Sequence, residues 1–371
     1  MMWGMGFNNP SWSWSELESA LSDRGRTPQA PRTGRDGRAP GSPSWNSGGD
    51  APGWSRKRQP FEAPSDLAPV PAGITVPYAE LHCHSNFSFL DGASHPEELA
   101  TEAARLGLEA LAVTDHNGFY GVVRFAEAAK AVGIPTVFGS ELTVLDGRLD
   151  AGQLPLGRVA RSEAETRAQV DTGLVPDSHA ADPSGTHVLV LADGTEGYAR
   201  LARVISQGHL AGEKGAPRFA FDDLAHGLAG HAWVLTGCRK GAVPSALDAD
   251  GVVAARRELE RLVDAFGRDR VLVELWDHGE PTDTARNDAL YELARAADVG
   301  CVATNNVHYA TPHQRRLATA LAAVRSRRSL ADIDAWLPAG AGAHLRSGAE
   351  QAHRFRRYPG AVEMTVEIGR A

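Results

Sequence analysis

From Tyr78 onward, short apolar runs alternate along the chain with segments that have one apolar face. Several of the runs are apolar at every position, which is typical of parallel strands buried on both faces. The segments between them space apolar residues three and four apart, as helices with one buried side do. We predict strands at residues 78–84, 110–114, 135–144, 187–192, 233–236, 271–275 and 301–304.

Helices are expected after most of these strands. Leu99, Ala103 and Leu106 share one helical face, and Gly107 directly after them is a typical helix end. A second helix is expected to stop in the same way at Gly133. Alternating strands and helices predict an α/β fold with a parallel sheet, and this many units favours a closed barrel over an open sheet.

Three regions depart from this alternation. Residues 1–72 are rich in Gly, Pro, Ser and Arg, which predicts a poorly ordered leader. Residues 146–185 are polar and predict a surface insertion within the barrel at 73–312. Residues 313–371 are mainly helical and are expected to form an extension of the barrel.

The first helix of this extension carries arginines beside an apolar stripe of Leu317, Leu321 and Val324. We interpret the arginines as a solvated helix face, and contact with a phosphate backbone is the alternative. They are Arg315, Arg316, Arg325, Arg327 and Arg328.

Composition narrows the class of protein. The chain of 371 residues is 42% hydrophobic with a net charge of −8, which does not indicate a nucleic-acid binder. No apolar run is long enough to span a bilayer, so we expect no membrane partner. Cys83, Cys238 and Cys301 are an odd number spread far apart, which argues against a disulfide framework and predicts a cytoplasmic location.

Side chains that can bind metals follow the ends of the predicted strands. His82 and His84 are two apart on a strand and should therefore project to the same face. In a parallel barrel such strand ends meet at one face, where the chemistry lies. His187 is the exception, because it lies at the start of its strand. The full candidate set is His82, His84, Asp91, His116, Glu141, His187, Cys238, Asn306 and His308.

Taken singly, each candidate has an ordinary structural interpretation. A lone buried histidine is usually a satisfied core residue, and a lone cysteine is usually a small hydrophobe. Their number, one or two per strand end, exceeds what one ion needs and indicates a cluster of two or three ions. Clustered divalent ions bind phosphoryl oxygens and lower the pKa of water, so phosphoester hydrolysis is the predicted reaction class.

Several motifs resemble those of the PHP (polymerase and histidinol phosphatase) domain. They are LHCHS at 81–85, TDH at 114–116, GSE at 139–141 and ATNNVHY at 303–309. With VELWDHG at 273–279, the chain is similar to the N-terminal portion of bacterial C-family (DnaE-type) error-prone DNA polymerases. The resemblance implies a distorted (β/α)7 barrel, with the candidate set above as its metal positions.

The resemblance also implies cofactors and partners. The barrel would hold two or three divalent ions (Zn, Mn or Fe), whereas Mg would serve only the polymerase palm. The parent protein would be a DNA-directed DNA polymerase, a nucleotidyltransferase of damage-tolerant replication and DNA repair, and DNA would be its partner. Asn306 departs from the pattern, because metal-binding members usually have Asp there.

The second departure concerns the palm, which should follow Ala371 in such polymerases. We therefore expect that this chain does not polymerise DNA, that it binds DNA weakly or not at all alone, and that it packs against a polymerase core. The Asp-x-Asp pairs that it does contain lie in helix or loop contexts, at Asp248/Asp250 and Asp332/Asp334. Two alternatives stay open: a stand-alone metal-dependent PHP phosphoesterase or 3′-exonuclease, and a non-catalytic structural module.

Overall fold

A computed structural model describes residues 61–67, 75–144, 185–213, 215–333, 337 and 340–371. The predicted leader (1–72) and the predicted insertion (146–185) fall almost entirely outside the described residues. Both therefore stay predictions.

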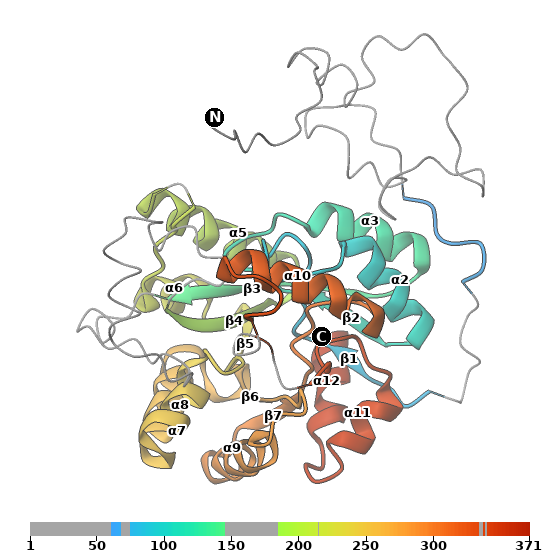
Figure 1. Cartoon of the computed structure of the whole chain (residues 1–371). Helices are drawn as coiled ribbons and strands as arrows, with labels where there is room; N and C mark the ends of the chain where they lie inside the picture. The colour runs from blue at the N-terminus through green and yellow to red at the C-terminus, as the bar shows by residue number, and fades with distance from the viewer. Residues whose placement is uncertain (1–60, 68–74, 145–184, 214, 334–336, 338–339) are drawn as a thin grey trace, which may run out of the picture. The chain divides into compact units, whose positions relative to one another are not determined.

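The described residues form a seven-stranded sheet whose strands are neighbours in chain order (Figure 1). The strands are Ala79–Glu80 (β1), Ala110–Val113 (β2), Thr136–Val144 (β3), Thr186–Ala192 (β4), Ala232–Leu235 (β5), Val271–Leu275 (β6) and Gly300–Ala303 (β7). Every predicted strand is present, although β1 is shorter than the prediction. The expected α/β barrel class is confirmed.

Strand β4 runs against its two neighbours. Strands β1 to β3 are mutually parallel, as are β5 to β7, but β4 is antiparallel to both β3 and β5. The prediction of a wholly parallel sheet is therefore wrong at β4. An apolar run has the same pattern in either direction, and antiparallel neighbours need no helical crossover between them. The apolar pattern alone therefore could not distinguish the two directions of β4. Because Thr143 pairs with His187, the start of β4 lies beside the end of β3.

The two edges of the sheet meet beyond the ends of β1 and β7. Cys83 forms a parallel bridge with Val307. The His84 amide donates to the Val307 carbonyl at 2.8 Å, and the Val307 amide donates to the His82 carbonyl at 2.8 Å. These bonds close the barrel at the end where the carboxyl ends of the parallel strands lie.

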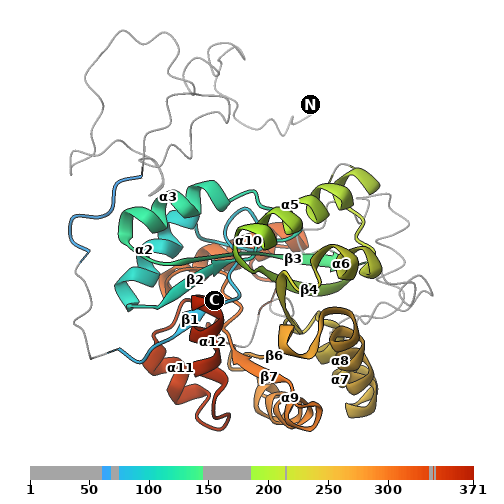
Figure 2. The ribbon, with the colours of Figure 1, turned by 180° about the vertical axis from the view of Figure 1, so that it is seen from behind.

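Helices lie around the outside of the strands, with α2, α3 and α5 on one side and α7, α8 and α9 on the other (Figures 1 and 2). Gly107 and Gly133 end α2 and α3 with φ of 69° and 76°, as predicted. The helices of this part are Pro96–Leu106 (α2), Val122–Val132 (α3), Gly194–Ala211 (α5), Phe221–Leu228 (α6), Ala242–Asp250 (α7), Val252–Phe266 (α8), the 3₁₀ turn Arg268–Arg270 (η3) and Asp283–Ala297 (α9).

The last helices complete the structure: Pro312–Gln314 (η4, a 3₁₀ turn), Arg315–Ser326 (α10), Gly348–Arg354 (α11) and Ala361–Arg370 (α12). Helix α12 packs against β1, β2 and β7. Its Ile368 belongs to the barrel core together with Ala79 and Leu272. A Cβ placed on Gly369 would lie 2.9 Å from the Ala79 Cβ, so α12 approaches the start of β1 closely. The domain limits proposed from the sequence stay a prediction.

In the part of the chain that the structure describes, no helix combines the length and the apolarity that crossing a membrane would require.

Candidate metal centre

The segment His82-Cys83-His84 is held in an extended conformation by its neighbours on both sides. Cys83 is buried and bridges to Val307. On the other side its amide donates to the Thr114 hydroxyl at 3.0 Å, and its carbonyl accepts from the Thr114 amide at 2.8 Å. Side chains two apart on extended backbone share a face. The Nε2 atoms of His82 and His84 accordingly lie 3.0 Å apart, as predicted.

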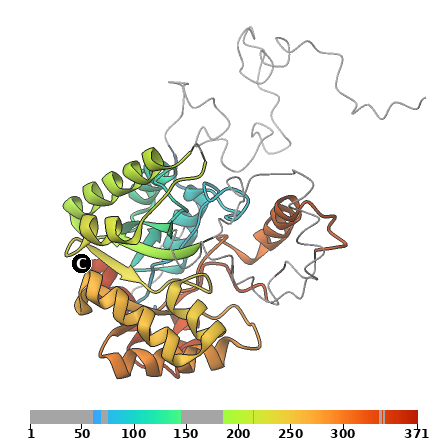
Figure 3. The same cartoon turned by 90° about the vertical axis from the view of Figure 1, so that its left-hand side faces the viewer.

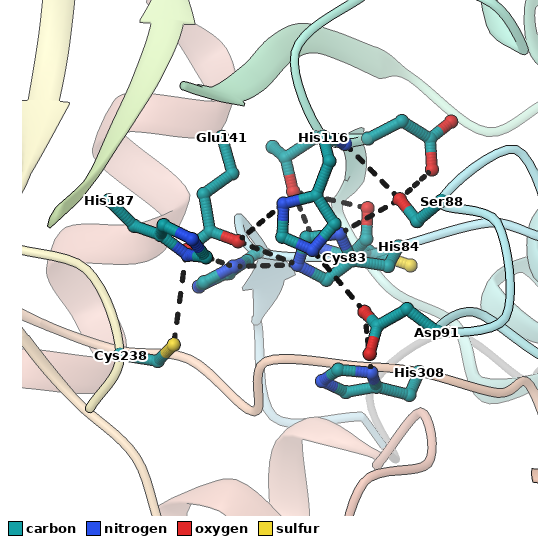
Figure 4. Close-up of polar contacts among 12 residues, drawn as sticks. Cys83, His84, Ser88, Asp91, His116, Glu141, His187, Cys238 and His308 are labelled. Atoms are coloured by element: carbon teal, nitrogen blue, oxygen red, sulfur yellow. Dashed lines mark hydrogen bonds and ion pairs between the residues drawn. The ribbon is translucent and has the colours of Figure 1, made fainter. Parts of the chain in front are cut away.

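Glu141 lies in the second half of β3, and its carboxylate lies among the histidines of the centre (Figure 4). Its Oε1 lies 3.2 Å from Nδ1 of His187 and 3.7 Å from Nε2 of His82. Its Oε2 lies 3.2 Å from Nδ1 of His116 and 3.4 Å from Nε2 of His84. One buried carboxylate thus faces four histidines. The antiparallel direction of β4 is what brings His187 to this end of the barrel.

Asp91 extends the centre toward the end of β7. Its Oδ2 lies 3.4 Å from Nε2 of His116 and 3.2 Å from Nδ1 of His308. Its Oδ1 accepts a hydrogen bond of 2.8 Å from Nη1 of Arg325. Arg325 therefore contacts the centre, so the interpretation of this arginine as part of a solvated face is wrong.

The donor atoms form three groups in which every pair lies within 4.8 Å. Neighbouring groups share a residue, so the groups are continuous. They are His82, His84 and Glu141; His84, Asp91 and His116; and His116, Glu141 and His187. Imidazole and carboxylate are ligands that suit Zn, Mn and Fe. The geometry therefore fits a cluster of metal ions that share ligands.

The two remaining candidates differ in how they meet this cluster. The Sγ of Cys238 lies 3.8 Å from Oε1 of Glu141, which places it at the edge of the centre. The Asn306 side-chain oxygen is buried and has no hydrogen-bond partner among the described residues. A buried oxygen without a partner is costly, and an amide oxygen can bind a metal ion. Asn306 thus fits a ligand role, although no hydrogen bond joins its side-chain oxygen to the other candidates.

The protonation states of three of the donor residues also suit metal binding. Burial would raise the pKa of Glu141, but the adjacent His187 and His82 hold it well below its usual range. Burial would also raise the pKa of Asp91, but His308 lowers it, and the pKa is again well below its usual range. Burial and neighbouring histidines lower the pKa of His84 far below its usual value. The centre therefore favours charged carboxylates and a neutral His84, which are the forms that bind cations.

Glu274 of β6 contacts the centre and is not among the candidates predicted from the sequence. It is fully buried, and its Oε1 lies 2.7 Å from Nδ1 of His82 and accepts a short bond from the Thr304 hydroxyl. Burial opposes the charged form of His82, but the Glu274 and Glu141 carboxylates raise its pKa well above the usual value. A carboxylate on Nδ1 leaves Nε2 as the ligand atom. Glu274 is the single charged residue in the apolar run of residues 271–275. A buried carboxylate needs a partner, so this position could have indicated a contact with the centre.

A second network orients His84 from the other side. The Ser88 hydroxyl lies 3.2 Å from Nδ1 of His84 and donates to Oδ1 of Asp115 at 2.8 Å. Asp115 also accepts from the amide and the hydroxyl of Ser85, both at 2.7 Å. These bonds fix the loop that follows β1 onto the end of β2. Nothing in the spacing of these residues distinguished them from ordinary loop polarity.

Comparison with known proteins now decides the family. The profile of the PHP domain matches residues 80–278, more than half of the chain. The chain belongs to the PHP domain family. This match includes most of the metal-centre residues described above, and it confirms the resemblance found in the sequence. Asn306 and His308 lie beyond the matched residues.

Relatives narrow the branch of this PHP domain. The chain is 49% identical over 385 aligned residues to an error-prone DNA polymerase of Nocardia farcinica, with 99% of this chain and 32% of that protein covered. It is 46% identical over 370 residues to an error-prone DNA polymerase of Mycobacterium tuberculosis, with 100% of this chain and 30% of that protein covered. The chain thus spans about a third of the length of the curated relatives it matches.

Solved structures give a weaker likeness to this PHP domain. An amidohydrolase of Chromobacterium violaceum matches with a TM-score of 0.41 and 17% identity, over 62% of this chain and 88% of that chain. A two-domain protein of Bacteroides vulgatus, containing a predicted PHP-like metal-dependent phosphoesterase, matches with a TM-score of 0.33 and 15% identity, over 62% and 52% of the two chains. At these scores the likeness adds nothing to the argument.

Proposed function

We propose that this chain is the PHP region of an error-prone DNA polymerase and that its barrel binds two or three divalent ions, Zn, Mn or Fe. The observation that carries the proposal is the continuity of three donor groups around Glu141. Identities of 46–49% to error-prone DNA polymerases support the parent protein. The proposed ligands are the nine candidates, His82, His84, Asp91, His116, Glu141, His187, Cys238, Asn306 and His308.

The reaction that this centre supports best is hydrolysis of a phosphoester. Divalent ions, when bound, would polarise phosphoryl oxygens and supply an acidic water. The chain's own contribution is to hold the donors: Glu274 fixes the ring of His82, and Ser88 fixes the ring of His84. The substrate class would be a small phosphomonoester or the 3′ end of DNA.

A non-catalytic structural role is the second candidate, and one observation favours it. Asn306 brings an uncharged amide where a carboxylate would add a charge to the centre. With one charge fewer, the ion beside it would be held more weakly. The barrel would then serve to pack against a polymerase core.

Polymerisation is not expected of these 371 residues by themselves. Asp248 and Asp250 are exposed at the end of α7, and Asp332 is exposed in a turn, whereas Asp334 lies outside the described residues. None of the three that are described lies in the buried, convergent arrangement that two magnesium ions need for nucleotidyl transfer. DNA is the proposed partner of the parent polymerase, and this chain alone should bind it weakly.

The proposal is tested by assaying the full chain, loaded with manganese, against p-nitrophenyl phosphate and a 3′-labelled single-stranded oligonucleotide. Turnover should vanish in His84→Ala and persist in His353→Ala, a change at an exposed helix position. Bound metal without turnover on either substrate would instead support the structural role. Turnover that survives His84→Ala would mean that a different site, or a contaminant, performs the reaction.

A further inference from the structure

Arg325 directly contacts a carboxylate of the centre, that of Asp91. It lies in the last turn of α10, outside the strands and helices that form the barrel wall. Asp91 turns Oδ2 toward His116 and His308 and Oδ1 toward the Arg325 guanidinium. The Arg325 side chain is 22% exposed, so it is both in contact with the centre and accessible from solvent.

The hydrogen bonding of Arg325 differs from that of the arginines that support the fold. Arg124 binds Glu97 through two parallel bonds, of 2.6 and 2.9 Å. The buried Arg346 donates through Nη2 to two carbonyl oxygens, at 2.8 and 2.9 Å. Arg325 makes a single bond, to Asp91, among the described residues. A guanidinium has five N–H donors, so most of those of Arg325 have no acceptor among the described residues.

Helix α10 does not depend on the Arg325 ion pair for its position. Just before the helix, the Gln314 side-chain oxygen accepts from the Ala310 amide at 3.1 Å and from the Ser94 hydroxyl at 2.7 Å. Leu321 packs against the small cluster that contains Tyr309. Figure 3 shows α10 beside the loop that follows β1. The helix is therefore held by contacts other than the Arg325–Asp91 pair, and these contacts place Arg325 beside the centre.

We propose that Arg325 binds the phosphoryl group of the substrate. In the free protein its guanidinium pairs with Asp91, and with substrate bound its remaining donors take the non-bridging phosphoryl oxygens. The planar fork of a guanidinium matches a phosphate through two parallel hydrogen bonds, which a lysine cannot reproduce. This inference rests on the proposed phosphoester hydrolysis, for which it names the residue that selects a phosphorylated substrate.

The test is calorimetric titration of inorganic phosphate into the full chain loaded with manganese. Arg325→Gln should weaken phosphate binding about 10- to 100-fold, the usual effect of losing hydrogen bonds to a charged group. Arg325→Lys should lose less, because it keeps the charge. Arg328→Gln, at an exposed position just beyond the same helix, is the matched control and should bind phosphate like the wild type. Manganese stoichiometry should be the same in all four proteins.

The assignment would be overturned by an unchanged phosphate affinity in Arg325→Gln, or by the absence of phosphate binding to the manganese-loaded wild type. Loss of manganese from Arg325→Gln and Arg325→Lys alike would also overturn it, because Arg325 would then act only by holding Asp91. Thermal melting identifies a variant that does not fold, in which case Arg325→Lys alone decides. Absence of turnover in the wild type would contradict the proposed hydrolysis. It would not contradict the role of Arg325, provided that phosphate affinity still depends on this residue.

Discussion

The two ends of the same barrel are built from opposite kinds of residue. At the end where the strands begin, the packing is mainly between small and apolar residues: Ala79, Ala110 and Gly369 meet closely, and Ile368 joins the core. At the end where the parallel strands finish, buried carboxylates and histidines face one another around Glu141. The first arrangement stabilises the fold by excluding water from apolar surface. The second concentrates charge in a place where charge is costly.

This contrast separates stability from function along the barrel axis. Burying charged groups is tolerated only when they are paired or bind metals. The residues of the polar end are therefore expected to serve binding. Those of the apolar end are expected to stabilise the fold. A substitution at one end should change one property and leave the other nearly intact.

The largest effect is expected from Glu141→Gln. The amide keeps the shape of the side chain but removes the charge that faces four histidines. Loss of a ligand shared by two donor groups should weaken manganese binding by more than the roughly 10- to 100-fold that an outer partner contributes. Calorimetry with manganese measures this. Glu363→Gln, at an exposed position of α12, is the control. Equal manganese affinity in the two variants would contradict the centre.

Ile368→Ala tests the other end. Removing a buried aliphatic side chain from the core should lower the free energy of unfolding by about 2–5 kcal/mol. Urea unfolding in the presence of a chelator measures this without the contribution of metal binding. The exposed Leu317→Ala on α10 should have little effect. If the folded Ile368→Ala protein binds less manganese per chain than the wild type, the two ends are not independent.

Glu274→Gln is expected to have an intermediate effect. A neutral amide in place of the carboxylate holds the Nδ1 proton of His82 less strongly, so Nε2 is a poorer ligand. Metal affinity should fall about 10- to 100-fold, as for other partners of ligating histidines. The comparison is with Glu260→Gln, an exposed position of α8. An unchanged affinity would show that Glu274 serves the fold alone.

Asn306→Asp should have the smallest effect, and in the opposite direction. The residue has φ of 41°, a conformation that Asp adopts as Asn does, so the backbone should tolerate the change. A charged oxygen in place of the amide should raise manganese affinity several-fold. Calorimetry on Asn306→Asp and wild type measures this. An unchanged affinity would place the side chain outside the centre.

Much of the fold was predictable because strand and helix periodicities are local signals. All seven strands were found, and both glycine helix ends at 107 and 133 were correct. The direction of β4 was not predicted, because an apolar run such as residues 187–192 looks the same in either direction. The absence of a helical pattern at 146–185 was the signal that could have shown it, since antiparallel neighbours need no crossover helix.

The site was predictable where motif and strand end coincide and not where a partner comes from a distant segment. His82, His84 and His116 follow strand ends, Glu141 lies in the second half of β3, and their donor atoms meet as expected. Glu274 and Arg325 reach the centre from a strand and a helix. Which side of these elements is turned toward the centre is set only by tertiary packing. An arginine on a helix looks solvated in sequence whether or not a carboxylate lies beside it. The nine-residue ligand set and the domain limits stay predictions.

The central claim is that the polar end of the barrel is a metal cluster. Its most direct test is the metal content of the purified full chain by mass spectrometry, after chelation and reloading with excess manganese. We expect two or three ions per chain, lost on chelation and regained on reloading. A single ion or fewer per folded chain at saturating manganese would show that the polar end does not hold a cluster.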